Sequence, residues 1–150
     1  MSVIGFNIKK GELWYCILEG TRGAPVYVGH DRHRFDAAQP RTELANYFKQ
    51  TFSEVIDRAP GSRLAYRLSL EAKKADQVAY LTFPFGILNL VAHERGLHIR
   101  EYVTQSFTAK ALGVKDDKFA ACDALISGRP GKWDKDAKLA ALSAWVSLDE

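Results

Sequence analysis

The spacing of apolar residues changes once along the chain, and this change limits the folds that the chain can adopt. Residues 3–30 hold three short runs rich in apolar residues, of which the first alternates, and turn residues such as Gly11 and Gly23 separate the runs. Such runs predict strands over residues 3–8, 13–18 and 25–30, and connections this short make consecutive strands antiparallel. Beyond residue 41 the apolar residues recur at helical spacing, and helical segments alternate with further strands. The pattern predicts an α/β fold with a mixed sheet.

The second part of the chain supplies the remaining elements of this fold. Leu44, Phe48, Phe52 and Val55 share one face of a helix that we expect Thr42 to cap. The following elements are a strand over 63–70, a buried helix over 77–95, a strand over 97–103, short helices over 105–112 and 116–126, and a last helix over 134–148. The sequence thus predicts a five-stranded mixed sheet, three antiparallel strands followed by alternating helix and strand, flanked by helices. No repeat or linker divides it, so residues 1–150 are expected to form one domain.

The composition excludes several classes of protein. With 47% hydrophobic and 26% charged residues, the chain is able to form a core and is not of the disordered class. Cys16 and Cys122 each lie in an apolar segment, which predicts buried thiols and not a disulfide framework. The first residues lack an export signal, and the longest nearly uncharged stretch is too short to span a bilayer, so we expect a cytoplasmic protein without a membrane segment.

Four short motifs, in order along the chain, resemble the RuvC family of Holliday-junction resolvases, which has the ribonuclease H-like fold. The segment Val3-Ile4-Gly5-Phe6-Asn7 is similar to the family's opening strand. Residues 67–86, with Ala72-Lys73-Lys74-Ala75-Asp76, resemble its second catalytic strand and the segment after that strand. Residues 100–118 resemble its fifth strand and the next helix, and residues 134–140 resemble the start of its last helix.

The resemblance implies an active site in which this chain lacks most of the required acids. RuvC-like nucleases bring four carboxylates together to hold two divalent metal ions, which activate water for phosphodiester cleavage. Asn7 stands where the family has Asp, Arg67 stands where it has Glu, and Ala137 replaces one of the two acids of the last helix. Asp134 matches the other acid, and Glu71 and Asp136 lie near matching positions. We therefore predict a degenerate site, in which Arg67 pairs with Asp134 and Asn7 hydrogen-bonds beside them.

Basic residues gather in the segments that would border this site. The formal net charge of +3 does not by itself indicate a nucleic-acid partner, but Lys and Arg with an aromatic residue among them suit a phosphate backbone and a stacked base. An ordinary charged surface is the alternative interpretation, and Asp116, Asp117, Asp134 and Asp136 dilute the positive charge. The candidate nucleic-acid-binding residues are Lys73, Lys74, Lys110, Lys118, Arg129, Lys132, Trp133 and Lys135.

The segment His30-Asp31-Arg32-His33-Arg34 has two histidines three residues apart, with an acid between them. Two histidines at that spacing chelate a metal when they lie on a helix. Here the segment follows a predicted strand, and its two arginines would repel a cation. We interpret it as a solvated loop.

Three functions remain open from the sequence. The favoured one is binding of nucleic acid, preferentially DNA, by a RuvC-like domain impaired for metal-dependent cleavage, a pseudoenzyme without a cofactor. The second is an active, divergent Mg²⁺-dependent endonuclease whose metal ligands would be Glu71, Asp134 and Asp136. The third is a protein-interaction module on the same fold. RuvC acts as a dimer, so the resemblance also implies a homodimer.

Overall fold

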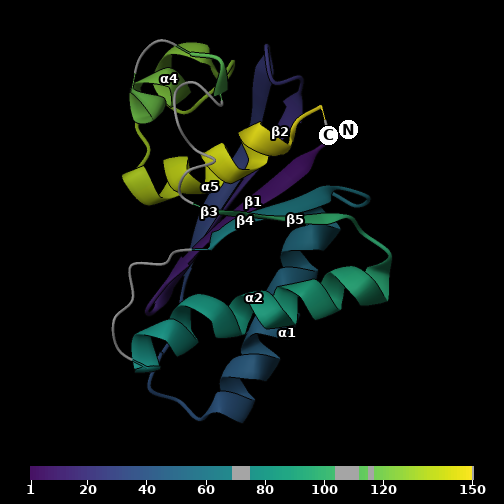
Figure 1. The fold of residues 1–150 in the computed structure, drawn as a ribbon, viewed down its shortest axis with the longest axis vertical. Coiled ribbons are helices and arrows are strands. Elements are labelled where there is room, and N and C mark those ends of the chain that lie inside the picture. The colour runs from purple at the N-terminus through teal and green to yellow at the C-terminus, as the bar shows by residue number, and fades with distance from the viewer. Residues whose placement is uncertain (69–74, 104–111, 115–116, 150) are drawn as a thin grey trace.

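A five-stranded sheet with helices on both faces organises the protein, in the strand order β3-β2-β1-β4-β5 (Figure 1). The computed structural model describes residues 1–68, 75–103, 112–114 and 117–149. The first three strands form an antiparallel meander: β1 (Val3–Lys9), β2 (Glu12–Gly20) and β3 (Pro25–Arg34). Gly11, with φ of +83°, makes the tight turn between β1 and β2.

The remaining strands extend the sheet from β1 in parallel. Helix α1 (Arg41–Arg58) leads to β4 (Arg63–Leu68), which pairs with β1, and helix α2 (Ala75–Arg95) leads to β5 (Ile99–Val103), which pairs with β4. Both crossovers pass over the same face of the sheet, which places α1 against α2. The predicted fold class, a mixed five-stranded sheet flanked by helices, is confirmed.

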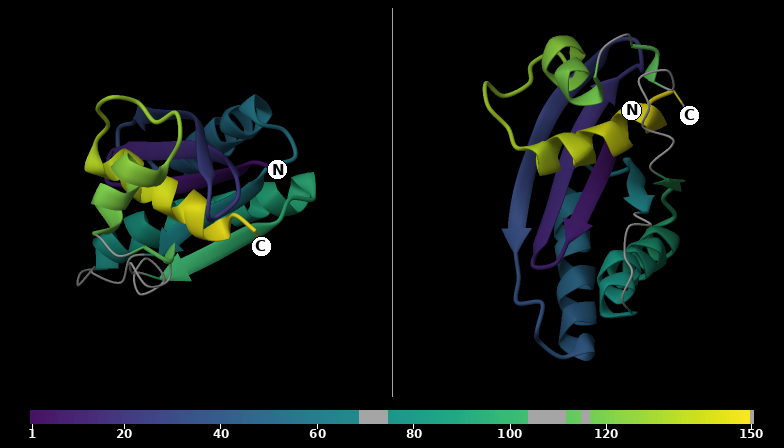
Figure 2. Two further views of the ribbon diagram at one scale, coloured as in Figure 1. Left: turned by 90° about the horizontal axis from the view of Figure 1, so that it is seen from above. Right: turned by 60° about the vertical axis from the view of Figure 1, so that its left-hand side comes forward.

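The C-terminal helices cover the opposite face. Helix α4 (Lys118–Leu125) begins at Asp117, whose side chain accepts hydrogen bonds from the backbone N–H groups of Phe119 and Ala120. Helix α5 (Lys135–Ser147) then crosses β1 and β2. Figure 2 shows α5 on one side of the meander and α1 and α2 on the other.

Each face of the sheet has its own hydrophobic core. Ile4, Phe6 and Leu64 point toward α1 and α2, where they pack with Phe52 and Leu88. The alternate residues of the same strands point toward α5. Leu90, at 52% exposure, shows that α2 is amphipathic, so the expected burial on all sides of this helix is wrong.

Glycine at position 5 allows α5 to lie directly on β1. A Cβ atom at Gly5 would stand 2.0 Å from the carbonyl oxygen of Ala140 and 2.6 Å from the backbone nitrogen of Ala144. The helix presents small buried residues to this strand, among them Ala137 and Ala141. This close approach determines which residues of the first turn of α5 reach the sheet.

Two local predictions are corrected by the structure. Residues 30–34, interpreted as a loop, continue β3 in register with β2, from Cys16↔His30 to Glu12↔Arg34. Backbone pairing with β2 therefore outweighs the polar composition of that segment. Helix α1 begins after Pro40 without a side-chain cap, so Thr42 does not cap it.

Two further predictions concern helices. Of the short helix predicted over 105–112, residues 105–111 lie outside the described residues. Among the residues that the structure does describe, no helix is both long and apolar enough to cross a membrane.

Candidate functional site

A row of side chains crosses the sheet beside the first turn of α5. Asn7 on β1 is in register with Trp14 on β2, and Trp14 is in register with Arg32 on β3. On the other side of β1, the parallel pairing Phe6↔Tyr66 places the next residue, Arg67, beside Asn7. Because side chains alternate between the faces of a strand, the row lies on the face that α5 covers. The strand register thus brings Asn7 and Arg67 together.

The acid that meets Asn7 is Asp136. The Asn7 amide donates to the Asp136 Oδ1 at 3.2 Å and to its carbonyl oxygen at 3.4 Å. The Lys9 ammonium donates to the other carboxylate oxygen, Oδ2, at 2.8 Å. This hydrogen bond raises the pKa of Lys9 above its usual value. We call Asn7, Lys9 and Asp136 the β1 centre; within it, nitrogen donors hold both carboxylate oxygens.

The predicted pair between Arg67 and Asp134 is not formed. Within the described residues no hydrogen bond or ion pair joins them, and the Nε of Arg67 is buried without a hydrogen-bond partner. Asp134 is the exposed residue immediately before α5, and Asp136 lies about 200° further round the helix. Because α5 turns its Asp136 side toward β1, the ion pair forms between Asp136 and Lys9.

The described residues do not fit a two-metal site. Divalent magnesium takes anionic oxygen ligands, whereas the β1 centre provides one carboxylate, one neutral amide and one ammonium. In the part of the chain that the structure describes, no three His, Cys, Asp or Glu side chains are placed to hold a metal ion. Glu71 lies outside the described residues.

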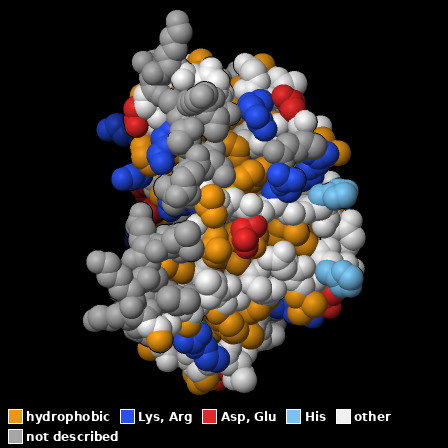
Figure 3. All heavy atoms as spheres, in the orientation of Figure 1, with side chains coloured by type: hydrophobic (Ala, Val, Ile, Leu, Met, Phe, Trp, Pro, Cys, Tyr) orange, Lys and Arg blue, Asp and Glu red, His pale blue; other side chains and the backbone are white. Residues whose placement is uncertain are grey.

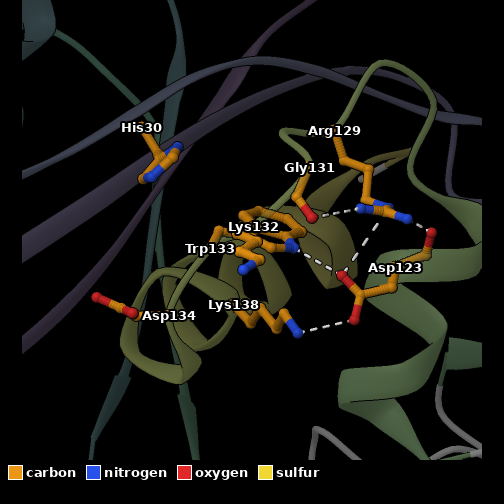
Figure 4. A pocket seen from close by; sticks show the side chains of 8 residues that line it. All are labelled: His30, Asp123, Arg129, Gly131, Lys132, Trp133, Asp134 and Lys138. Atoms are coloured by element: carbon orange, nitrogen blue, oxygen red, sulfur yellow. Dashed lines mark hydrogen bonds and ion pairs between the residues drawn. The ribbon is translucent and has the colours of Figure 1, made fainter.

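A second candidate site is a hollow where β3 meets the connection between α4 and α5. Its volume is about 640 Å³. We call it the α5 groove, and Figure 4 shows its lining residues, which are His30, Asp123, Arg129, Gly131, Lys132, Trp133, Asp134 and Lys138.

Asp123 organises one wall of the α5 groove. Its carboxylate accepts hydrogen bonds from the Lys138 ammonium and from the Trp133 indole N–H, each at 2.8 Å. The hydrogen bond from Lys138 has the largest effect on the pKa of Asp123, and together with the bond from Trp133 it holds that pKa below its usual value. Arg129 donates through Nε to the carbonyl oxygen of Asp123 at 2.6 Å and through Nη1 to that of Pro130 at 2.9 Å. The side chains of this wall are therefore fixed before any ligand binds.

Aromatic rings line the side of the groove next to β3. The Trp133 and His30 ring centroids lie 6.0 Å apart at 60°, and Tyr27 contacts both rings. The Tyr27 hydroxyl and the His30 Nδ1 are 2.6 Å apart, which fixes the imidazole. A smaller hollow of about 240 Å³, bordered by Trp14 and Arg32, shares His30 and Asp134 with the α5 groove.

The two candidate sites are linked along β2. The Glu12 carboxylate lies 3.5 Å from the Lys9 ammonium and 3.8 Å from the Arg32 guanidinium. Arg32 in turn lies over the Trp14 ring, 5.2 Å from its centroid. Charged contacts therefore lead from Lys9 through Glu12 to Arg32, which borders the smaller hollow beside the α5 groove.

The structure places part of the predicted basic surface in the α5 groove. Arg129, Lys132 and Trp133 line it. Lys118 and Lys135 lie together over the Phe119 ring, 5.3 and 5.1 Å from its centroid. In Figure 3, Lys and Arg side chains gather mainly in the half of the molecule that holds α4 and α5. The other predicted basic residues, Lys73, Lys74 and Lys110, lie outside the described residues.

Sequence reasoning missed three members of this surface. His30 ends the predicted strand and Arg32 falls in the segment interpreted as a loop, whereas Asp123 belongs to a segment interpreted only as apolar. A signal for the first two exists, because His30 and Arg32 continue the two-residue period of the third strand. Nothing in the sequence pattern indicates that Asp123 would lie under Trp133.

Comparison with known proteins identifies the fold. No protein-family model and no curated protein sequence matches the chain. Among solved structures, it is similar to Thermus thermophilus RuvC in complex with Holliday junction substrate, with a TM-score of 0.81 and 12% identity over 97% of this chain and 92% of that one. A second structure of Thermus thermophilus RuvC gives a TM-score of 0.78 with 14% identity, over the same shares of the two chains.

A more distant match is the Fowlpox virus resolvase in complex with substrate Holliday junction DNA. Its TM-score is 0.51 and its identity 11%, over 95% of this chain and 94% of that one. At these identities the matches establish architecture and not activity. The resemblance drawn from the four motifs is confirmed at the level of the fold: the chain has the RuvC-like form of the ribonuclease H-like fold.

Proposed function

We propose that this protein binds nucleic acid through the α5 groove and that it is impaired for metal-dependent phosphodiester cleavage. The observation that carries the proposal is the α5 groove itself, in which cationic side chains and a tryptophan share one hollow on a RuvC-like fold. Two of the similar structures hold Holliday junction DNA, which favours DNA as the ligand and branched DNA as the first form to test.

The charge of the α5 groove suits a phosphate backbone. Its lining contains three positively charged side chains, Arg129, Lys132 and Lys138, and two negatively charged ones, Asp123 and Asp134. Lys138 is already bound to Asp123, whereas within the described residues Lys132 has no hydrogen bond or ion pair. Lys132 is exposed at the rim, so its ammonium can meet a phosphate without breaking an existing contact.

The β1 centre supports the impairment. A metal ion at Asp136 would have to displace the Lys9 ammonium and would gain no charge from Asn7. A guanidinium at Arg67 would further oppose a cation beside Asn7. Active cleavage would instead need Glu71, Asp134 and Asp136 to act together, and Asp134 lies on the groove side of α5. Homodimerisation, which the resemblance implies, remains part of the proposal and is measurable by sedimentation velocity.

The test is a titration against labelled single strand, duplex and four-way junction with Mg²⁺ or Mn²⁺ present. Each sample is run on a native and on a denaturing gel. We expect a shift without cleavage, and an affinity that falls steeply with salt because phosphate contacts release counterions. Metal-dependent cleavage abolished by Asp134→Ala would establish the nuclease instead. Neither a shift nor cleavage would favour the protein-interaction module.

A pair of double variants locates the binding surface. Lys132→Ala with Lys135→Ala removes two positive charges at the start of α5, and we expect it to weaken binding at least fivefold. Lys49→Ala with Arg95→Ala removes two charges from α1 and α2, on the opposite face, where Lys49 pairs with Glu94. This control should leave the affinity within about twofold of the parent. Equal losses in the two variants would mean that the α5 groove is not the contact surface.

A further inference from the structure

Trp133 is the one tryptophan placed to meet a ligand. The other two are buried, with Trp14 at 4% and Trp145 at 1% exposure, whereas Trp133 is half-buried and lines the α5 groove. Its indole N–H donates to Asp123, and Tyr27 makes a T-shaped contact with its ring at 5.9 Å and 90°. A ring held on two sides in this way loses little conformational entropy when a ligand stacks on it.

The space beside this ring has the size and the polar groups that a nucleotide requires. The hollow of about 640 Å³ lies within the range of small-molecule sites. His30 contacts the Trp133 ring, with 6.0 Å between the ring centroids, and Lys132 lies at the rim. The Asp134 carboxylate, which makes no capping hydrogen bond at the start of α5, provides acceptors for amino groups on a base edge. Aromatic rings, a cation and an acceptor thus line one hollow.

We propose that the α5 groove holds an unpaired base stacked on the Trp133 ring, with the adjoining phosphate at Lys132. This inference rests on the proposed function and narrows its ligand to nucleic acid with unpaired or splayed nucleotides. In a continuous duplex the faces of the bases are covered by their neighbours, and only their edges are open. A side chain that binds by stacking therefore selects bases that have left the helix.

The experiment compares two oligomers with the same number of phosphates. One is fluorescein-labelled (dT)12, and the other is an abasic phosphodiester of the same length, so that they differ only in their bases. Fluorescence anisotropy of the full chain gives the affinity for each. Stacking of one base on an aromatic residue corresponds to roughly 5- to 150-fold in affinity. We expect (dT)12 to bind more tightly than the abasic oligomer by a factor in that range.

Variants at Trp133 assign the difference to the ring. Trp133→Ala should remove the preference for (dT)12 while leaving the affinity for the abasic oligomer within about twofold of the parent's. Retained binding of the abasic oligomer also shows that the variant is folded. Trp133→Phe, which retains a ring but loses the N–H to Asp123, should keep most of the preference. Lys132→Ala should lower the affinity for both oligomers by the same factor, because Lys132 contacts the phosphate that both oligomers have.

The outcomes separate this inference from the proposed function. Salt-dependent binding of both oligomers with equal affinity would overturn base stacking and leave nucleic-acid binding standing. A preference for (dT)12 that survives in Trp133→Ala would place the stacking ring elsewhere and overturn the assignment to the α5 groove. If neither oligomer binds, base stacking at Trp133 is overturned, and the proposed function fails as well only if the duplex and the four-way junction also give no shift.

Discussion

Replacing Gly5 by alanine should destabilise the protein because it forces α5 away from the sheet. The new Cβ would stand 2.0 Å from the Ala140 carbonyl oxygen, whereas ordinary contact begins at 3.4 Å. Both close neighbours, at Ala140 and Ala144, are backbone atoms of α5, so no side-chain rotation relieves the clash. The whole helix has to move. Overpacking of a core costs about 1–3 kcal/mol, and a rigid backbone neighbour places Gly5→Ala at the upper end of that range.

Thermal and urea unfolding measure this effect. For a domain of about 150 residues, 1 kcal/mol shifts Tm by about 2–4 °C, so Gly5→Ala should lower Tm by about 6–12 °C. Gly29→Ala is the matched control: Gly29 lies on β3, and a Cβ there meets nothing within 4 Å. We expect the free energy of unfolding of this control to stay within about 0.5 kcal/mol of the parent's.

The comparison of these two variants tests whether α5 lies directly on β1. If Gly5→Ala melts within about 2 °C of Gly29→Ala, α5 does not lie this close to β1. The position of Asp136 beside Asn7 would then lose its support, because it depends on the same approach.

Three further predictions concern charge. The lowered pKa of Asp123 means that its contribution to stability is present above the unfolded pKa of about 3.9 and is lost as pH falls through the lower folded value. Fluorescence of Trp133 should therefore change with acidification only below about pH 4, and Asp123→Asn should lack this transition. Lys9→Met should lower the free energy of unfolding in urea by less than about 1 kcal/mol, since the Lys9 side chain is 52% exposed; a loss above about 2 kcal/mol would contradict that expectation. At matched ionic strength, DNA affinity in a gel-shift titration should agree within about twofold in EDTA and in Mg²⁺, and a fivefold loss on chelation would indicate that a metal takes part.

The sequence was sufficient to predict the sheet and its two helical layers, because each depends on local periodicity. Alternation in β1 marks which of its residues face α5, and the short turn at Gly11 forces the antiparallel pairing. Residues 13–18 of β2 are all apolar, so the register with β1 determines which of them face α5. The end of β3 was mispredicted because the side chains of residues 30–34 are all polar, although the backbone of this segment pairs with β2. A strand at the edge of a sheet needs no apolar side chains to be held by its hydrogen bonds.

The choice between Asp134 and Asp136 illustrates what a motif leaves undetermined. Both acids lie within one turn of the start of α5, so their spacing alone allows either to reach the sheet. The angle at which α5 lies on β1 selects Asp136, and that angle depends on contacts between Gly5 and a run of alanines at the other end of the chain. The two-residue offset between the predicted pair and the observed one is thus a consequence of tertiary packing.

Under the proposed function, loss of the metal ligands and binding of nucleic acid have the same physical cause. A cluster of carboxylates repels a phosphate and needs metal ions between the two. Around β1 this chain instead has the Lys9 ammonium, the Arg67 guanidinium and the Asn7 amide, and the Asp136 and Glu12 carboxylates both lie beside Lys9. These donors can hold an anionic oxygen without a metal ion, as Lys9 and Asn7 already do with Asp136, and the Nε of Arg67 is a buried donor without a partner among the described residues. The substitutions that oppose a metal ion at this position therefore favour an anion there, which is why we expect binding to be indifferent to chelation.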